Sequence, residues 1–267
     1  MAHALCLARC SSGATILRSS LLERCGFRHG FSTRRGGVSE APFEQLNLAR
    51  PDSAAEMAAF AVNRARFLSA CDLASRVLVT VRQVHGCAVA DGDEIDLDAM
   101  DVEADAIVSR DPHRAIGVRT ADCVPVLVAC QDTGAVAAIH AGWRGIVAGV
   151  IERAIDAMRR RPTGRLVAAI GPAISCAAYE VGGEVAGAFA SRDLGDCVHR
   201  GPSGREHVDC HAAVARILVR HGVDASSIDG TPWCTFGDAD LCYSHRRDAA
   251  RSGRMLAVIG AEALRRP

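Results

Sequence analysis

The sequence predicts one α/β (α+β) domain in which packed mixed β-sheets are covered by outer helices. Short apolar or β-branched runs outnumber the helical segments, yet the two kinds alternate along the chain. Apolar residues make up 49% of the 267 positions, which is sufficient for a large buried core. No internal repeat or low-complexity linker divides the chain. We therefore expect residues 15–267 to form a single domain and residues 1–14 a loose N-terminal segment.

The first third of the chain predicts a strand followed by a helix. A short apolar stretch over residues 16–25 leads into residues 27–37, whose closing Gly-Gly pair is typical of a turn after a strand. A helix is predicted over residues 52–73, because Asp52 or Ser53 can cap its start and apolar side chains then recur at helical spacing.

The rest of the chain predicts short strands interrupted by helices. Turn residues separate β-rich runs that we expect to be strands, at residues 77–81, 105–109, 115–119, 124–130 and 135–140. An amphipathic helix is predicted over residues 146–160, because its apolar residues fall on one face. The remaining expected elements are a strand at 166–170, helices at 183–191 and 209–221, and a final strand at 253–259.

Composition excludes several classes of function. The 31 basic and 31 acidic residues cancel, so nothing indicates a nucleic-acid or membrane partner. No apolar run is long enough for a transmembrane helix, and the first residues do not resemble a signal peptide. Twelve cysteines without a Cys-x-x-Cys pair are typical of a reducing compartment, which favours a cytoplasmic location. The chain has no lysine, which excludes Schiff-base and P-loop lysine chemistry.

Three segments each bring a potential metal ligand to the expected end of a strand. They are Arg82-Gln-Val-His85-Gly86, Thr120-Ala-Asp-Cys123-Val-Pro125 and Ala138-Ala-Ile-His140-Ala-Gly-Trp-Arg-Gly145. A strand fixes such a side chain while the adjoining loop leaves one face open. A catalytic zinc takes three cysteine or histidine ligands and keeps one open position. His85, Cys123 and His140 therefore form a candidate catalytic metal site, which copper could also occupy.

The same residues allow two other interpretations. In a metal-free cysteine hydrolase, Cys123 would be the nucleophile and His140 the base. Zinc bound to that sulfur would prevent it from acting as a nucleophile. The metal site and the hydrolase site therefore cannot exist in the same molecule at the same time. A structural zinc site would instead be closed by a fourth protein ligand, for which Cys87 and Cys130 are the nearest choices.

Arginines and rare aromatic residues indicate a possible binding site for an anion or a base. Arg34, Arg144 and Arg246 lie near expected turns, and planar guanidinium groups suit phosphate. Arg144 also directly follows the His140 strand at the expected start of a helix. Tyr179 and Trp143 lie near glycines and are candidates for stacking on a base.

A series of motifs occurs in order along residues 16–260. They are Phe31-Ser-Thr-Arg-Arg-Gly-Gly-Val-Ser39, Leu46-Asn47-Leu48, Gln83-Val-His-Gly86, Thr120-Ala-Asp-Cys-Val-Pro125, His140-Ala-Gly-Trp-Arg-Gly145, Gly171-Pro-Ala-Ile174, Tyr179-Glu-Val181, Cys234-Thr235, Ser244-His-Arg-Arg-Asp248 and Gly253-Arg254. Together these motifs resemble the bacterial family known as "laccase domain" or polyphenol oxidase, whose members are described as purine nucleoside phosphorylases with adenosine deaminase activity.

The resemblance implies a zinc-dependent enzyme with small-molecule partners. It implies zinc held by His85, Cys123 and His140, phosphorolysis of adenosine, inosine, guanosine and methylthioadenosine, and hydrolytic deamination of adenosine. It also implies a fold similar to the catalytic domain of the cytotoxic necrotising factor toxins. Substrate and phosphate would then meet Arg34, Asn47, Arg144, Tyr179 and Arg246. We expect a monomer or weak homo-oligomer.

Both reactions need a general acid or base, for which Asp122 and His29 are the candidates. Asp122 could instead orient a histidine or cap a turn. Two departures from the family pattern affect the C-terminal part of the pocket. Ser244-His245-Arg246 replaces the usual Ser-Tyr-Arg, and the turn before Gly253 is one residue longer than usual. Neither departure touches the three metal ligands.

The oxidase label itself implies a ligand set that this sequence lacks. A multicopper oxidase needs about ten histidines, largely as His-x-His pairs. The chain has ten histidines but no such pair, so a copper-dependent polyphenol oxidase is only an alternative. The His-x-Glu and Pro-Cys-x-x-Cys signature of zinc base deaminases is also missing. A hydrolase in cell-wall precursor quality control is a further alternative.

Overall fold

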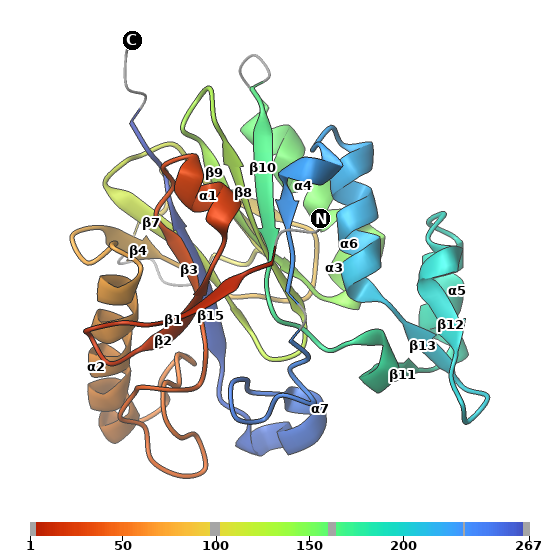
Figure 1. Ribbon diagram of the computed structural model, residues 1–267, viewed down its shortest axis with the longest axis horizontal. Coiled ribbons are helices and arrows are strands. Elements are labelled where there is room, and N and C mark those ends of the chain that lie inside the picture. The colour runs from red at the N-terminus through yellow and green to blue at the C-terminus, as the bar shows by residue number, and fades with distance from the viewer. Residues whose placement is uncertain (1–3, 97–101, 160–163, 232, 264–267) are drawn as a thin grey trace.

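The computed structural model describes residues 4–96, 102–159, 164–231 and 233–263. Two six-stranded sheets pack against each other, with helices on both outer faces (Figure 1). Helix α2 (Ala54–Ala70) packs on the first sheet. On the second sheet lie α3 (Trp143–Ala148), α4 (Val150–Met158) and α6 (Cys210–Arg220). The mixed α+β class with several mixed sheets is therefore confirmed.

The first sheet has the strand order β1-β2-β3-β15-β7-β4. Its strands are β1 (Cys6–Arg9), β2 (Thr15–Arg18), β3 (His29–Ser32), β15 (Met255–Gly260), β7 (Arg114–Thr120) and β4 (Val77–Val79). Only the β4–β7 pair is parallel. The two faces of β15 alternate, because Leu256 and Val258 pack under α2 while Ala257 and Ile259 face the second sheet.

The second sheet has the strand order β14-β10-β8-β9-β6-β5. Its strands are β14 (Ile228–Asp229), β10 (Leu166–Ile170), β8 (Val124–Cys130), β9 (Val136–Ala141), β6 (Ala106–Ser109) and β5 (Val89–Asp91). Ala137 and Ile139 of β9 face the helices, whereas Val136 and Ala138 face the first sheet. Burial on both faces explains why these strands read as continuous apolar runs rather than alternating ones.

A small third sheet projects on the helix side of the second sheet, at the right edge of Figure 1. It consists of β11 (Glu180–Val181), β13 (Glu206–Val208) and β12 (Val198–Arg200), together with α5 (Gly183–Ala190). The remaining short elements are α1 (Ser20–Arg24), α7 (His245–Asp248) and the 3-10 turns Cys176–Ala178, Gly195–Cys197, Ala225–Ser227 and Ala249–Arg251. Among the described residues, no helix is long and apolar enough to cross a membrane.

Two expectations from sequence differ from the structure. Residues 6–9 belong to the segment expected to be loose, yet they form β1, which pairs antiparallel with β2. The helix expected over residues 146–160 is two helices, because Gly149 between them has φ +87°, a left-handed conformation that interrupts helical hydrogen bonding. Its expected last residue, Arg160, lies outside the described residues.

Candidate metal centre

The pairing of β8 with β9 brings two of the three candidate ligands together. Cys123 directly precedes β8, and His140 is the next-to-last residue of β9. In the antiparallel register Val124 lies opposite Ala141, and Pro125 lies opposite His140. The start of β8 and the end of β9 therefore meet at one edge of the sheet, which places the thiol beside the imidazole.

His85 comes from a loop rather than from a strand end. It lies between β4 and β5 with φ +58°, in the left-handed region that non-glycine residues rarely adopt. Its backbone N–H donates to Asp105 Oδ1 at 2.9 Å, and the N–H groups of Val84 and Gly86 donate to Asp105 Oδ2 at 3.2 and 2.6 Å. One carboxylate thus holds the whole turn that carries the ligand.

Asp105 also fixes the second histidine. His140 Nδ1 lies 2.7 Å from Asp105 Oδ1, and the Asp105 side chain is fully buried. A carboxylate partner on Nδ1 keeps the proton there, which leaves Nε2 available to a metal. Sequence reasoning did not single out Asp105 as a site residue. The sequence feature that could have indicated Asp105 is its position as the acidic first residue of the apolar run 105–109.

The three predicted ligands converge. The donor atoms of His85, Cys123 and His140 all lie within 4.8 Å of one another, and this is the one such cluster found among the described residues. The two imidazole centroids are 4.9 Å apart, with ring planes 79° apart. His140 is buried, Cys123 is partly buried and His85 is exposed, so the cluster is open on the His85 side.

The backbone beside the cluster leaves room for an ion and its ligands. Gly142 follows β9, and a Cβ atom at that position would lie 3.1 Å from Cys123 Sγ and 3.2 Å from His85 Cδ2. Both contacts would force the ligand side chains to shift. Two imidazoles and one thiol are also a donor set that suits zinc or copper. The residues therefore fit the implied metal.

Electrostatics in the metal-free protein favour the thiolate. Burial raises the pKa of Cys123, but contacts with His140 and His85 outweigh burial and lower it to about 6. Burial lowers the pKa of His140, but Asp105 and Cys123 outweigh burial and raise it to about 9. Burial also raises the pKa of Asp105, whereas His140 and the backbone N–H donors lower it overall. The thiolate is the form that binds metals and attacks electrophiles.

The cluster opens into a cavity of about 1500 Å³. All three ligands line it, together with four other residues singled out from the sequence: Asn47, Asp122, Tyr179 and Arg246. His245, from the unusual Ser-His-Arg segment, lines it as well. The cavity continues past the ligands along α2 and β4, so its volume is far larger than the metal cluster needs.

The Asp122 carboxylate accepts two hydrogen bonds that hold neighbouring loops together. Its Oδ1 accepts a hydrogen bond from Thr235 Oγ1, and its Oδ2 accepts one from the backbone N–H of Arg246, each at 2.6 Å. Asp122 itself has φ +91°, and its carbonyl accepts from the N–H of Ile174. These contacts tie the Cys123 turn to the C-terminal loop, and they argue for positioning rather than proton transfer.

Two arginines predicted to contact the substrate lie away from the cavity wall. Arg34 donates from Nε and Nη2 to the carbonyl of Glu44 and from Nη1 to that of Ala239, and it lines a separate depression. Arg144 is exposed, with its guanidinium 4.4 Å from the Trp143 ring centroid. Neither arginine is among the cavity-lining residues.

His29, the second candidate for a general acid or base, is buried in β3. Its Nε2 accepts from the N–H of Ser19 at 2.8 Å, and its Nδ1 donates to the carbonyl of Phe27 at 2.9 Å. Burial lowers its pKa, so the ring is neutral and both nitrogens are engaged. It does not line the cavity, and the structure gives it no route to a substrate there.

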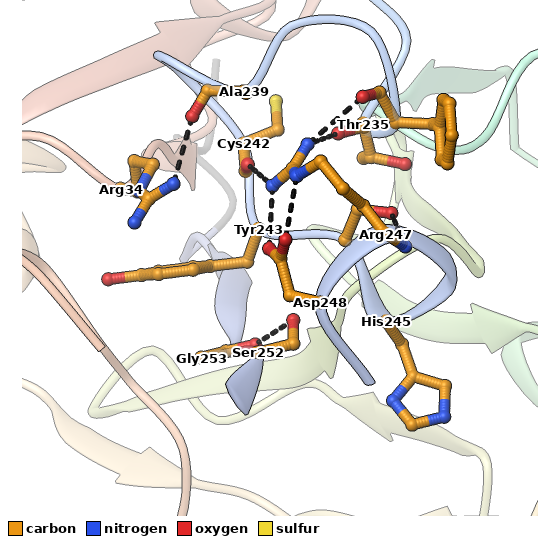
Figure 2. Close-up of polar contacts among 12 residues, drawn as sticks. Arg34, Thr235, Ala239, Cys242, Tyr243, His245, Arg247, Asp248, Ser252 and Gly253 are labelled. Atoms are coloured by element: carbon orange, nitrogen blue, oxygen red, sulfur yellow. Dashed lines mark hydrogen bonds and ion pairs between the residues drawn. The ribbon is translucent and has the colours of Figure 1, made fainter. Parts of the chain in front are cut away.

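The C-terminal loop forms one wall of the cavity and is held by an arginine (Figure 2). Arg247 donates to the carbonyls of Thr235, Phe236 and Cys242 and forms a double contact with Asp248. This frame presents Arg246, whose guanidinium lies 5.0 Å from the Tyr179 ring centroid and donates to the carbonyl of Glu180. Tyr179 and Arg246 together offer a flat, cationic surface.

Comparison with known proteins places the chain in a family. Residues 28–262 match a family model described as multi-copper polyphenol oxidoreductase laccase. The chain belongs to this laccase-like family. The family resemblance predicted from the motifs is therefore confirmed, and the matched region contains every residue of the metal centre.

Relatives within the laccase-like family bear names of purine enzymes. A purine nucleoside phosphorylase of Deinococcus radiodurans is 38% identical over 235 residues, covering 87% of this chain and 88% of that protein. "Adenosine deaminase RL5", from an unknown prokaryotic organism, is 39% identical over 194 residues, covering 68% and 74%. The crystal structure of YlmD from Geobacillus stearothermophilus has a TM-score of 0.84 at 27% identity, covering 96% of this chain and 99% of that one.

Proposed function

We propose that this chain is a zinc-dependent purine nucleoside phosphorylase that also deaminates adenosine. The observation that carries the proposal is the His85–Cys123–His140 cluster, which is anchored by Asp105 and open to a cavity of about 1500 Å³. The names of the phosphorylase and deaminase relatives support the two activities. Adenosine, inosine, guanosine and methylthioadenosine are the proposed nucleosides.

The roles of the residues follow from their places in the cavity. His85, Cys123 and His140 would hold the metal, which supplies Lewis-acid polarisation of an oxygen in the cavity. Asp105 keeps the His140 ring oriented and holds the His85 turn. Tyr179 and Arg246 provide a surface on which a purine ring can stack. Asp122 fixes the position of the Arg246 loop relative to the Cys123 turn through its two hydrogen bonds.

A cysteine hydrolase is the second candidate, and one observation favours it. Cys123, His140 and Asp105 are arranged as nucleophile, base and orienting carboxylate, with the pKa of the thiol lowered to about 6. That arrangement needs a free sulfur, whereas the proposed enzyme uses the same sulfur as a metal ligand. Metal occupancy of the purified protein therefore separates the two candidates.

The test combines metal analysis with two assays on protein expressed without added metal. We expect one zinc per chain, phosphate-dependent release of base from inosine, and release of ammonia from adenosine. Cys123→Ala removes the sulfur ligand, so we expect it to lose most of the metal and both activities. Cys6→Ala, which alters an exposed cysteine of β1, is the matched control and should retain all three.

Two results would contradict the proposal in different ways. Stoichiometric zinc in Cys123→Ala would show that the ligand assignment is wrong. A wild-type protein that carries zinc but releases no base from any purine nucleoside with phosphate would show that the proposed activity is wrong.

A further inference from the structure

Among the cavity-lining arginines that sequence reasoning did not assign to the site, two belong to the paired strands β7 and β15 or directly adjoin them. Arg119 belongs to β7, and Arg254 directly precedes β15. Arg119 lies opposite Leu256 in the antiparallel register. Arg254 is two residues before Leu256, so the two arginines are diagonal neighbours on one face of the sheet, with a typical spacing of about 7–8 Å.

The Arg119 guanidinium has no acidic partner within the described ranges. Its Nε donates to the carbonyl of Leu48 at 2.8 Å, and its central carbon lies 6.0 Å from the Phe60 ring centroid. Burial and then the nearby charge of Arg50 lower its pKa to about 10, which still leaves it charged at neutral pH. Its Nε is engaged by Leu48, which leaves the two Nη groups as donors toward the cavity that Arg119 lines.

Asn47 holds its side-chain amide in one orientation beside Arg254. Its Oδ1 accepts from the N–H of Ala49 at 3.0 Å and from the N–H of Arg254 at 2.9 Å. Because two N–H donors fix the oxygen, the Nδ2 amino group must point the other way. Nδ2 makes no hydrogen bond to any residue that the structure describes, and Asn47 lines the cavity.

Arg254 is close both to Asn47 and to the metal centre, because its N–H contacts Asn47 and the charge of Cys123 acts on its guanidinium. Its Nη1 donates to the carbonyls of Ser252 and Gly253 at 2.9 and 3.0 Å, which leaves Nε and Nη2. Burial lowers its pKa, while the negative charges of Asp122 and Cys123 act in the opposite direction. Among the described residues no hydrogen bond or ion pair joins the Arg254 guanidinium to Asp122, whose oxygens accept from Thr235 and Arg246.

Three neighbouring groups thus present only donors to one part of the cavity. Guanidinium and amide N–H groups without acceptors recognise oxyanions, and phosphoryl groups suit paired arginines best. Arg119 is also only four residues before Cys123, so the two backbones are at most about 14 Å apart. A ligand that bridges the arginines and the metal centre is of the size of a nucleoside with a phosphoryl group.

We propose that Arg119, Arg254 and the Asn47 amide form an oxyanion subsite that binds a phosphoryl group beside the metal centre. The group is either inorganic phosphate, the second substrate of phosphorolysis, or the 5′-phosphate of a nucleotide. The role in phosphorolysis rests on the proposed function, whereas the binding of the anion does not. The subsite moves the expected phosphate contacts from Arg34 and Arg144 to residues that line the cavity.

Asn47→Asp is the sharpest test, because it is isosteric. The aspartate keeps the Oδ1 acceptor for Ala49 and Arg254 but replaces the free amino group with a negative oxygen. Arg119→Lys keeps the charge but loses the planar fork. Arg153→Gln, on the exposed face of α4, removes one positive charge away from the cavity and is the control. Thermal unfolding identifies any variant that fails to fold.

The measurement is calorimetric titration with sodium phosphate and, separately, with adenosine and AMP, in a phosphate-free buffer at constant ionic strength. We expect Asn47→Asp and Arg119→Lys to weaken binding of the phosphoryl ligand by about tenfold or more, the scale of a lost charge-assisted hydrogen bond. Adenosine binding and Arg153→Gln should stay close to wild type.

The titrations distinguish inorganic phosphate from a nucleotide as the ligand, and they test the subsite separately from the proposed function. Phosphate binding that is lost in the two variants assigns the subsite to inorganic phosphate. AMP that binds more tightly than adenosine, with the difference lost in the variants, assigns it to a nucleotide. If neither ligand is affected by the variants, the subsite is wrong. Because these readouts measure binding alone, a wild type without phosphorolysis would overturn the proposed function and leave this result interpretable.

Discussion

At the residue scale, the site depends most on Asp105. This one buried carboxylate accepts three backbone N–H groups from the His85 turn and contacts the His140 ring. Two of the three metal ligands are therefore positioned by a residue that does not itself belong to the ligand cluster. Such a partner orients a ligand and raises its basicity, which strengthens metal binding.

Replacement of Asp105 should weaken the metal site without removing a ligand. In Asp105→Asn one carboxylate oxygen becomes an amino group, which cannot accept from the backbone or from His140. We expect zinc affinity, measured by competition with a chelator, to fall about 10–100-fold. Asp93→Asn, at a carboxylate that accepts from Ser109 and Arg110 away from the cavity, is the control. Zinc affinity equal to that of the control would contradict the role of Asp105.

The ionisation of Cys123 makes a pH prediction for the metal-free protein. Its pKa is lowered to about 6, so the thiolate fraction should rise through that pH rather than near the usual value of 9.0. We expect alkylation of Cys123 by iodoacetamide, followed by peptide mass spectrometry, to reach half its maximal rate near pH 6. In Asp105→Asn the His140 charge is less well supported, so this midpoint should move upward. A wild-type midpoint near 9 would rule out the ion pair.

At the element scale, local sequence patterns predicted the long strands of the core but not the short strands β5, β11, β12, β13 and β14. The limits of β8 and β10 agree with the runs expected at residues 124–130 and 166–170. Long apolar runs bounded by turn residues give a strong local signal, and Ser53 caps α2 as one of the two expected caps. The break between α3 and α4 was missed, because a glycine inside an amphipathic pattern does not by itself reveal a positive φ.

The candidate site was only partly predictable from the sequence. The ligand types were visible, but the contact between Cys123 and His140 follows from the β8–β9 register. The places of Asp105 and Arg119 depend on pairing between segments far apart in the chain, which no local pattern contains. Arg34 is the opposite case. Its family motif is visible in the sequence, but its guanidinium donates hydrogen bonds to backbone carbonyls instead of facing the cavity.

At the scale of the whole molecule, the site lies where the chain passes from one sheet to the other. Cys123 belongs to the connection between β7 of the first sheet and β8 of the second. Residues of both sheets consequently line the cavity. His140 belongs to the second sheet, the Arg119–Arg254 pair lies at the first, and His85 and Cys123 lie in connections between the two. The similarity to the cytotoxic necrotising factor fold and the monomeric or weakly oligomeric state stay predictions.

This arrangement implies that the two proposed activities, phosphorolysis and deamination, share one pocket. Among the described residues there is a single cluster able to hold a metal, and the large cavity opens on it. Both activities should then depend on the same ligands. Guanosine, a proposed phosphorolysis substrate that is not itself the product of adenosine deamination, should also compete with adenosine for deamination.

The most direct test of this account is the ratio of the two activities in His85→Ala. We expect phosphorolysis of inosine and deamination of adenosine to fall together by roughly a hundredfold or more, because loss of a metal ligand exceeds the cost of losing an outer partner. His113→Ala, at an exposed histidine beside β7, should leave both rates unchanged. Loss of deamination with phosphorolysis intact would contradict the account, since the phosphate-dependent reaction would then not need the metal centre.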